Sequence, residues 1–140
     1  MSRFAKFAWA LLVLNLLVIL WGAVVRATGS GAGCGSHWPL CNGVVVPPAP
    51  AVETMIELFH RATSGLLGLL TILLVVWAWR RYGPGHWVRR GAAAALVLVI
   101  VEGLLGAGLV LFELVGGNTS LMRGGVAALH LANTLLLTAA

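Results

Sequence analysis

Two histidines stand in long apolar stretches of the sequence, where a titratable side chain is costly and usually functional. The first lies in the run Glu57-Leu-Phe-His60-Arg61, and the second is His130. Glu57 and His60 are three residues apart, so in a helix they share one face. An imidazole in such a place can ligate a haem iron, can carry protons or ions along a pathway, or can be a hydrogen-bonded packing residue.

Both histidines are expected at a similar depth in their helices. His60 follows Glu53 by seven residues and His130 follows Leu121 by nine, which corresponds to about 10 Å and about 13 Å of helix. Two imidazoles that face each other at one depth suit the two axial positions of a haem iron. The sequence therefore favours haem ligation, and the pathway and structural interpretations stay open.

Three other charged residues extend this candidate site. Arg26 and Arg61 lie at the outer ends of the first two apolar stretches, where guanidinium groups could bind haem propionates. The alternative is that both are long cations that reach the membrane interface without a specific partner. Glu102 lies in the middle of the third apolar stretch, so it must be protonated, paired or next to water.

Cys34 and Cys41 are the only cysteines, and both lie in a glycine-rich and proline-rich segment. A disulfide between them would close a small loop and contribute about 2–3 kcal/mol. The favoured interpretation is a structural disulfide. A redox-active pair and a metal site that also uses His37 are the alternatives.

Four apolar stretches must position these residues. The chain is 60% hydrophobic and 9% charged, whereas soluble domains carry about 25% charged residues. Each stretch could cross a hydrocarbon core of about 30 Å as a helix of about 20 residues. The sequence predicts one all-α integral membrane domain over 1–140, an antiparallel four-helix transmembrane bundle. Its expected spans are about 7–26, 54–79, 91–114 and 121–140, with a long outer loop at 28–53.

The basic residues predict the orientation of this bundle in the membrane. Three of them lie on the side of the 28–53 loop, and six lie on the other side. The six are Arg3, Lys6, Arg80, Arg81, Arg89 and Arg90. By the positive-inside rule, we expect a multi-pass plasma-membrane protein with both termini cytoplasmic and the long loop outside. Because the cations form short clusters between apolar runs, no nucleic-acid partner is expected.

Several motifs together resemble the amino-terminal half of the haem A synthases, over nearly the whole chain. The fourth apolar stretch also carries the expected histidine, His130. The motifs are Gly22-Ala-Val-Val-Arg26-Ala-Thr-Gly29-Ser-Gly31, then Cys34, Trp38-Pro39-Leu40-Cys41-Asn42-Gly43 and Glu57-x-x-His60-Arg61.

The resemblance implies an oxidoreductase of cytochrome oxidase biogenesis that converts haem O to haem A. Such enzymes oxidise a ring methyl to a formyl group, with water as the source of oxygen. Full-length members have eight spans in two four-helix halves, and each half holds a histidine pair on its second and fourth helices. One half carries a haem b cofactor, and the other is taken to bind the substrate haem.

Carried onto this chain, the resemblance makes Glu57 catalytic and makes His60 and His130 the axial ligands of haem iron. Cys34 and Cys41 become the outer-loop pair. Because the chain holds one half, the implied partners are a second copy or a second four-helix half, besides haem O, membrane lipid and haem O synthase. Glu102 departs from the family pattern, since a neutral polar residue such as glutamine is expected there.

Two rival functions remain at this point. A non-enzymatic bis-histidine haem protein, such as a cytochrome b-type electron carrier or a haem-handling assembly factor, would share the histidines but would not need Glu57. A small transporter or scaffold would use Glu102 as its proton site and would not need the histidines.

Overall fold

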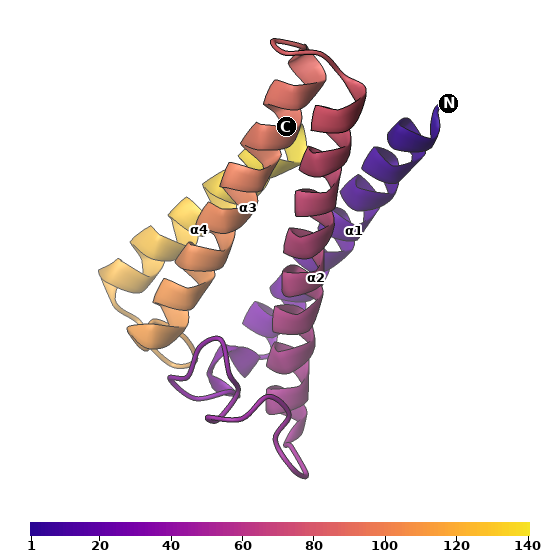
Figure 1. Ribbon diagram of the computed structural model, residues 1–140. Coiled ribbons are helices and arrows are strands. Elements are labelled where there is room, and N and C mark those ends of the chain that lie inside the picture. Colours follow the sequence, from indigo (N-terminus) through magenta and orange to yellow (C-terminus); the bar gives the residue numbers. More distant parts are fainter.

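The computed structural model describes all 140 residues, and long helices make up most of it. Figure 1 shows the long helices and the loops between them. The helices are α1 Arg3–Ala27, α2 Val52–Arg81, α3 Trp87–Leu111 and α4 Leu121–Ala139, with a short 3-10 helix, η1 Ser30–Ala32, after α1. The prediction of an all-helical chain is confirmed.

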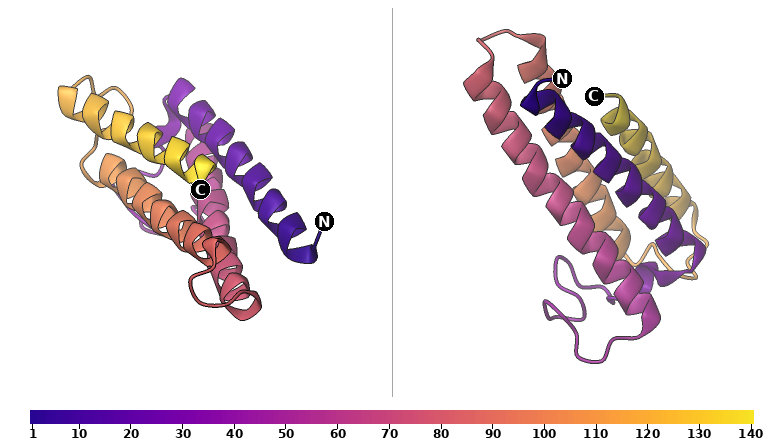
Figure 2. Two further views of the ribbon diagram at one scale, coloured as in Figure 1. Left: turned by 90° about the horizontal axis from the view of Figure 1, so that it is seen from above. Right: turned by 90° about the vertical axis from the view of Figure 1, so that its right-hand side faces the viewer.

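Successive helices run in opposite directions (Figure 1) and stand at the four corners of the molecule (Figure 2). α2 packs between α1 and α3, and α4 packs on α3 and also contacts α1. α2 and α4, the helices that carry the two histidines, therefore stand diagonally across the bundle. Both chain termini lie at the end of the α2–α3 turn, and the long loop lies at the opposite end (Figure 2).

Three of the helices, α1, α2 and α3, are long and apolar enough to cross a membrane. These three helices correspond to the first three apolar stretches of the sequence. α4 is a helix of 19 residues that does not reach the same apolar character. Its sequence carries Arg123, His130 and Asn133, whose polar side chains lower its hydropathy.

The distribution of side chains is the reverse of that in a soluble protein. Large apolar residues such as Leu20, Leu69 and Leu104 are more than 60% exposed. Only 20 of the 140 residues are buried, and seven of these are polar or charged. Since lipid accepts apolar side chains but cannot hydrogen-bond polar ones, polar groups gather inside the bundle.

Capping residues decide where the helices begin. The imidazole of His86 accepts the N–H of Val88 at 3.2 Å, so α3 begins at Trp87, before the apolar stretch itself. The hydroxyl of Ser120 accepts the N–H of Arg123 at 3.2 Å and begins α4. Each cap satisfies one backbone donor that the first helical turn leaves free.

Candidate functional site

A disulfide joins Cys34 and Cys41 in the loop between α1 and α2, and both residues are fully buried. The loop lies directly on the first turn of α2, where the Thr54 hydroxyl donates to the Gly33 carbonyl at 2.7 Å. A Cβ on Gly33 would lie 2.6 Å from the backbone of Glu53, so only glycine permits this close approach. Because the two sulfurs bind each other, the geometry favours a disulfide over the metal-site interpretation.

Glu57 and Arg61 of α2 hold this loop in place. Glu57 is 3% exposed, and its Oε2 accepts the N–H of Cys34 at 2.8 Å. Its Oε1 accepts from the Arg61 guanidinium, at 3.1 Å from Nε and also from a terminal nitrogen. The other terminal nitrogen of Arg61 donates to the carbonyls of His37 and Leu40, both at 2.6 Å. We call Glu57 and Arg61 together the loop clamp.

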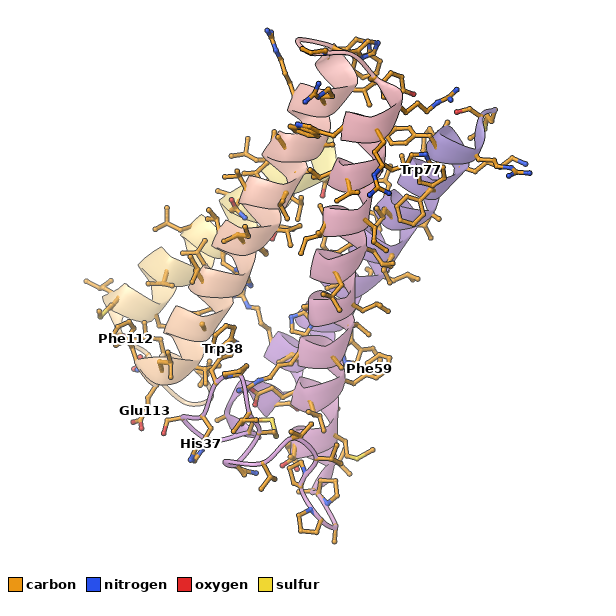
Figure 3. The ribbon with its side chains drawn as sticks, viewed as in Figure 1. His37, Trp38, Phe59, Trp77, Phe112 and Glu113 are labelled. Atoms are coloured by element: carbon orange, nitrogen blue, oxygen red, sulfur yellow. A yellow bond between two sulfur atoms is a disulfide. The ribbon has the colours of Figure 1, made fainter.

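The clamped loop covers one end of the bundle. Figure 3 shows His37 and Trp38 of the loop near the ends of α2 and α3, on the same side as Glu113. Phe59 of α2 points away from the bundle in the same view and is 53% exposed. The loop therefore covers this end of the bundle, and Glu57, which binds it, is one helical turn from His60.

His60 lies against α1 at a position where α1 has no side chain. A Cβ on Gly22 would lie 3.0 Å from Cε1 of the His60 ring, so the glycine provides the space that the ring occupies. The imidazole makes no hydrogen bond, and its Nδ1 is buried without a partner.

His130 of α4 lies beside a carboxylate of α3. Its Nδ1 is 3.2 Å from Oε1 of Glu102, but the two groups are not aligned as a hydrogen bond, and Nδ1 has no hydrogen-bond partner. Glu102 accepts instead from Nδ2 of Asn133 at 2.6 Å and from the Thr134 hydroxyl. A Cβ on Gly106 would lie 3.8 Å from the His130 ring, so this ring too lies beside a glycine.

The two imidazoles share features that suit a ligand between them. They come from diagonally opposed helices, each lies against a glycine, and each has a buried Nδ1 without a partner. Buried polar atoms without partners are rare in native proteins and require an explanation. An imidazole ligates haem iron through one ring nitrogen, and no hydrogen bond occupies either nitrogen of the two rings, so the residues present fit this group.

Comparison with known proteins decides which family this is. Residues 5–140 match the family model described as cytochrome oxidase assembly protein. The chain belongs to this family. Proteins named heme A synthase are among its relatives, so the resemblance to the haem A synthases is confirmed.

Three relatives show the extent of the similarity. A protein of Thermus thermophilus named protoheme IX farnesyltransferase is 55% identical over 99% of this chain and 23% of its own length. The heme A synthase of Alkalihalophilus pseudofirmus is 46% identical over 88% of this chain and 41% of its own length. That of Geobacillus kaustophilus is 39% identical over 99% and 44%, so the chain spans less than half of each of these relatives.

Arg26 and Arg61, which the sequence treats as equivalent candidates for binding propionates, differ in their hydrogen bonding. The donors of Arg61 are taken up by Glu57 and by the loop carbonyls. Arg26 is exposed at the end of α1, and its side chain makes no hydrogen bond or ion pair. Arg26 is thus the one whose guanidinium is available for an anionic group.

The hydrogen bonds between Glu102 and the helix that carries His130 were not predicted from the sequence. A signal for them existed, because α3 and α4 are joined by a short connection around Asn118. Residues equally far from that connection meet in an antiparallel pair, and Glu102 and Thr134 are each sixteen residues from Asn118. The clamping of the loop by Glu57 had no comparable signal, since it depends on how an irregular segment folds back.

Proposed function

We propose that this chain is the substrate-binding domain of a haem A synthase, with α1–α4 as four membrane spans. The observation that carries the proposal is the pair of unpartnered imidazoles, His60 and His130, on diagonal helices of a member of this family. They would be the axial ligands of the iron of haem O. Relatives named heme A synthase, 39–46% identical to the chain, support an enzyme of haem A biosynthesis.

The proposed reaction oxidises one ring methyl of haem O to a formyl group. Each conversion consumes one water and releases four protons and four electrons, so an electron acceptor outside this chain is required. A haem iron, when bound, supplies redox chemistry that amino acids cannot provide. The chain itself would hold the ring, exclude bulk water beneath the clamped loop and accept protons.

Glu57 is the proposed proton acceptor. It is a buried carboxylate one helical turn from His60 and on the same helix face. A carboxylate in this position could take a proton from a ligand bound to the imidazole. Its bonds to Arg61 and to the N–H of Cys34 fix the direction of the carboxylate. The loop clamp would therefore position the catalytic base as well as the loop.

Arg26 is the proposed partner of the haem propionates, since its guanidinium is free and lies at the outer end of α1.

We further propose that haem b, an electron-transferring cofactor, lies in a second four-helix half or in a second copy of this chain. Haem O synthase is the proposed supplier of substrate. The similarity to a protein named protoheme IX farnesyltransferase supports this, because haem O is a farnesylated haem.

The first test concerns the ligands. The chain is purified in detergent, reconstituted with haem, and its absorption spectrum compared with those of His60→Ala and His130→Ala. Each variant should lose the bis-histidine spectrum, since a single imidazole leaves one axial position open. His86→Ala is the control, because His86 caps α3 in the connecting turn and should bind haem as before. A double variant with an unchanged spectrum would contradict the proposal.

The rival is a non-enzymatic bis-histidine haem protein. One observation favours it, namely that both oxygens of Glu57 are already bonded within the loop clamp. Pigment extraction from cells supplied with haem O separates the two functions. If the chain is the enzyme, Glu57→Gln should lose the formyl-bearing product and keep the haem spectrum. If the rival holds, the wild-type chain yields no such product even beside a second four-helix half.

A further inference from the structure

An apolar cavity of about 580 Å³ lies between the four helices, in the half of the bundle away from the loop. Its size is within the range of small-molecule sites, about 300–1,000 Å³. Of the 21 residues that line it, 17 are hydrophobic and none is charged. We propose that this cavity holds the isoprenoid tail of haem O while the ring lies between His60 and His130. The inference rests on the proposed function and adds a subsite to it.

The wall of the cavity offers few polar groups to a ligand. Apart from the Tyr82 hydroxyl and the indole N–H groups of two tryptophans, only three polar side chains line it, those of Asn15, Thr71 and Thr138. Nδ2 of Asn15 donates to the Thr138 hydroxyl at 3.2 Å, and the Thr71 hydroxyl donates to the Leu67 carbonyl at 2.7 Å. With these groups already paired inside the protein, the cavity selects for a hydrocarbon chain.

The cavity begins at the same distance below both histidines. Leu67 follows His60 by seven residues and Leu137 follows His130 by seven, and both leucines line the cavity. Seven residues are two helical turns, so each leucine is on the face of its histidine and about 10 Å deeper. The cavity thus lies two helical turns from the imidazoles, on the same faces of α2 and α4.

The length of the tail matches this depth. A farnesyl chain of three isoprene units reaches about 13 Å when extended, by comparison with polypeptide, which advances about 3.4 Å for every three bonds. The tail also starts at the edge of the ring, which already lies inward of the iron. A haem ligated by His60 and His130 can therefore place its tail beside Leu67 and Val99, the latter a lining residue of α3.

Such a subsite would determine the rotation of the ring. Two axial ligands fix the iron, but they leave the ring free to turn about the axis that joins them. The propionates and the isoprenoid chain of haem O are on opposite sides of the ring. A tail held in the inner cavity would turn the propionates toward Arg26 at the outer end, and it would present one particular methyl to Glu57.

The test compares two ligands that differ in the tail. Haem O and haem b, which lacks the farnesyl group, are titrated into the purified chain in detergent and followed by absorption. The wild type should bind haem O more tightly than haem b. Ala95→Phe, which fills the cavity from α3, should weaken haem O by about tenfold or more, the scale on which apolar pockets discriminate added carbon atoms, and should leave haem b unchanged.

The matched control is Ala94→Phe, since Ala94 is the adjacent residue of α3, is exposed, and does not line the cavity. It should bind both haems like the wild type. Ala95→Leu, a smaller change, should give an intermediate loss and covers the case in which Ala95→Phe fails to fold.

Three outcomes would overturn the inference. The first is equal wild-type affinity for the two haems, and the second is an equal loss of both in Ala95→Leu. The third is displacement of a co-purified lipid chain by Ala95→Phe with haem O binding unchanged, which would make the cavity a lipid site. By contrast, a wild type that binds neither haem would defeat the proposed function itself.

Discussion

The two histidines of the candidate site are notable for missing neighbours: a side chain beside the ring and a hydrogen-bond partner. Gly22 provides space for the His60 ring, and neither imidazole has a hydrogen-bond partner at Nδ1. Glu102 illustrates the opposite case, since two donors of α4 satisfy a carboxylate that was expected to need a partner or water. The residues that matter for chemistry are therefore recognised by their bonding as much as by their type.

Gly22→Val should weaken haem binding. The new Cβ would lie 3.0 Å from Cε1 of His60, which is too close, so the ring must turn away from its present position. The measurement is a haem titration of the purified protein. Gly65→Val is the control, because Gly65 is also within a helix and has nothing within 4 Å of an added Cβ. Equal affinity in the two variants would argue against His60 as a ligand.

At the scale of elements, the loop between α1 and α2 is an ordered part of the site. The disulfide closes it on itself, and the Glu57–Arg61 clamp attaches it to α2. α4 is the long helix that falls short of the apolar character of a membrane-crossing helix, and its polar residues include His130 and Asn133. A helix that carries polar side chains into the bundle gives up part of its apolar character.

Replacing Cys34 and Cys41 together by serine should loosen the loop without dissolving the bundle. Loss of the closed loop should cost about 2–3 kcal/mol in the chain-entropy account. The measurement is thermal unfolding in detergent together with limited proteolysis of the 28–51 segment. Wild-type protein treated with a thiol reductant should behave in the same way as the variant. A variant as stable and as protease-resistant as the oxidised wild type would contradict the expected role.

At the scale of the whole molecule, both the basic residues and the fold distinguish the two ends of the bundle. Both termini and the α2–α3 turn lie at one end, and the disulfide loop lies at the other (Figure 2). The end with the turn carries six of the nine Lys and Arg residues. By the positive-inside rule, we expect this end to face the cytoplasm and the disulfide to face the oxidising side.

Thiol labelling of intact cells tests this orientation. Val45→Cys, in the loop and 74% exposed, should react with a membrane-impermeant reagent added outside. Gly83→Cys, in the α2–α3 turn, has nothing within 4 Å of the new Cβ and should react only after lysis. The native cysteines give no background because they are joined in the disulfide. The reverse labelling pattern would show that the chain is inserted the other way.

The sequence alone determined the helical class, three helices long and apolar enough to cross a membrane, and the family, because apolar runs of about 20 residues and short motifs are local properties. The positions of His60 and His130 in their helices also followed from counting residues. Only the tertiary structure decided that Arg61 binds the loop while Arg26 stays free, that Glu102 meets Asn133 and Thr134, and that an apolar cavity lies between the helices two turns from the histidines. These features depend on the rotation of each helix about its axis and on the path of an irregular loop. Neither is encoded in a local pattern, since both result from packing among residues distant in the chain.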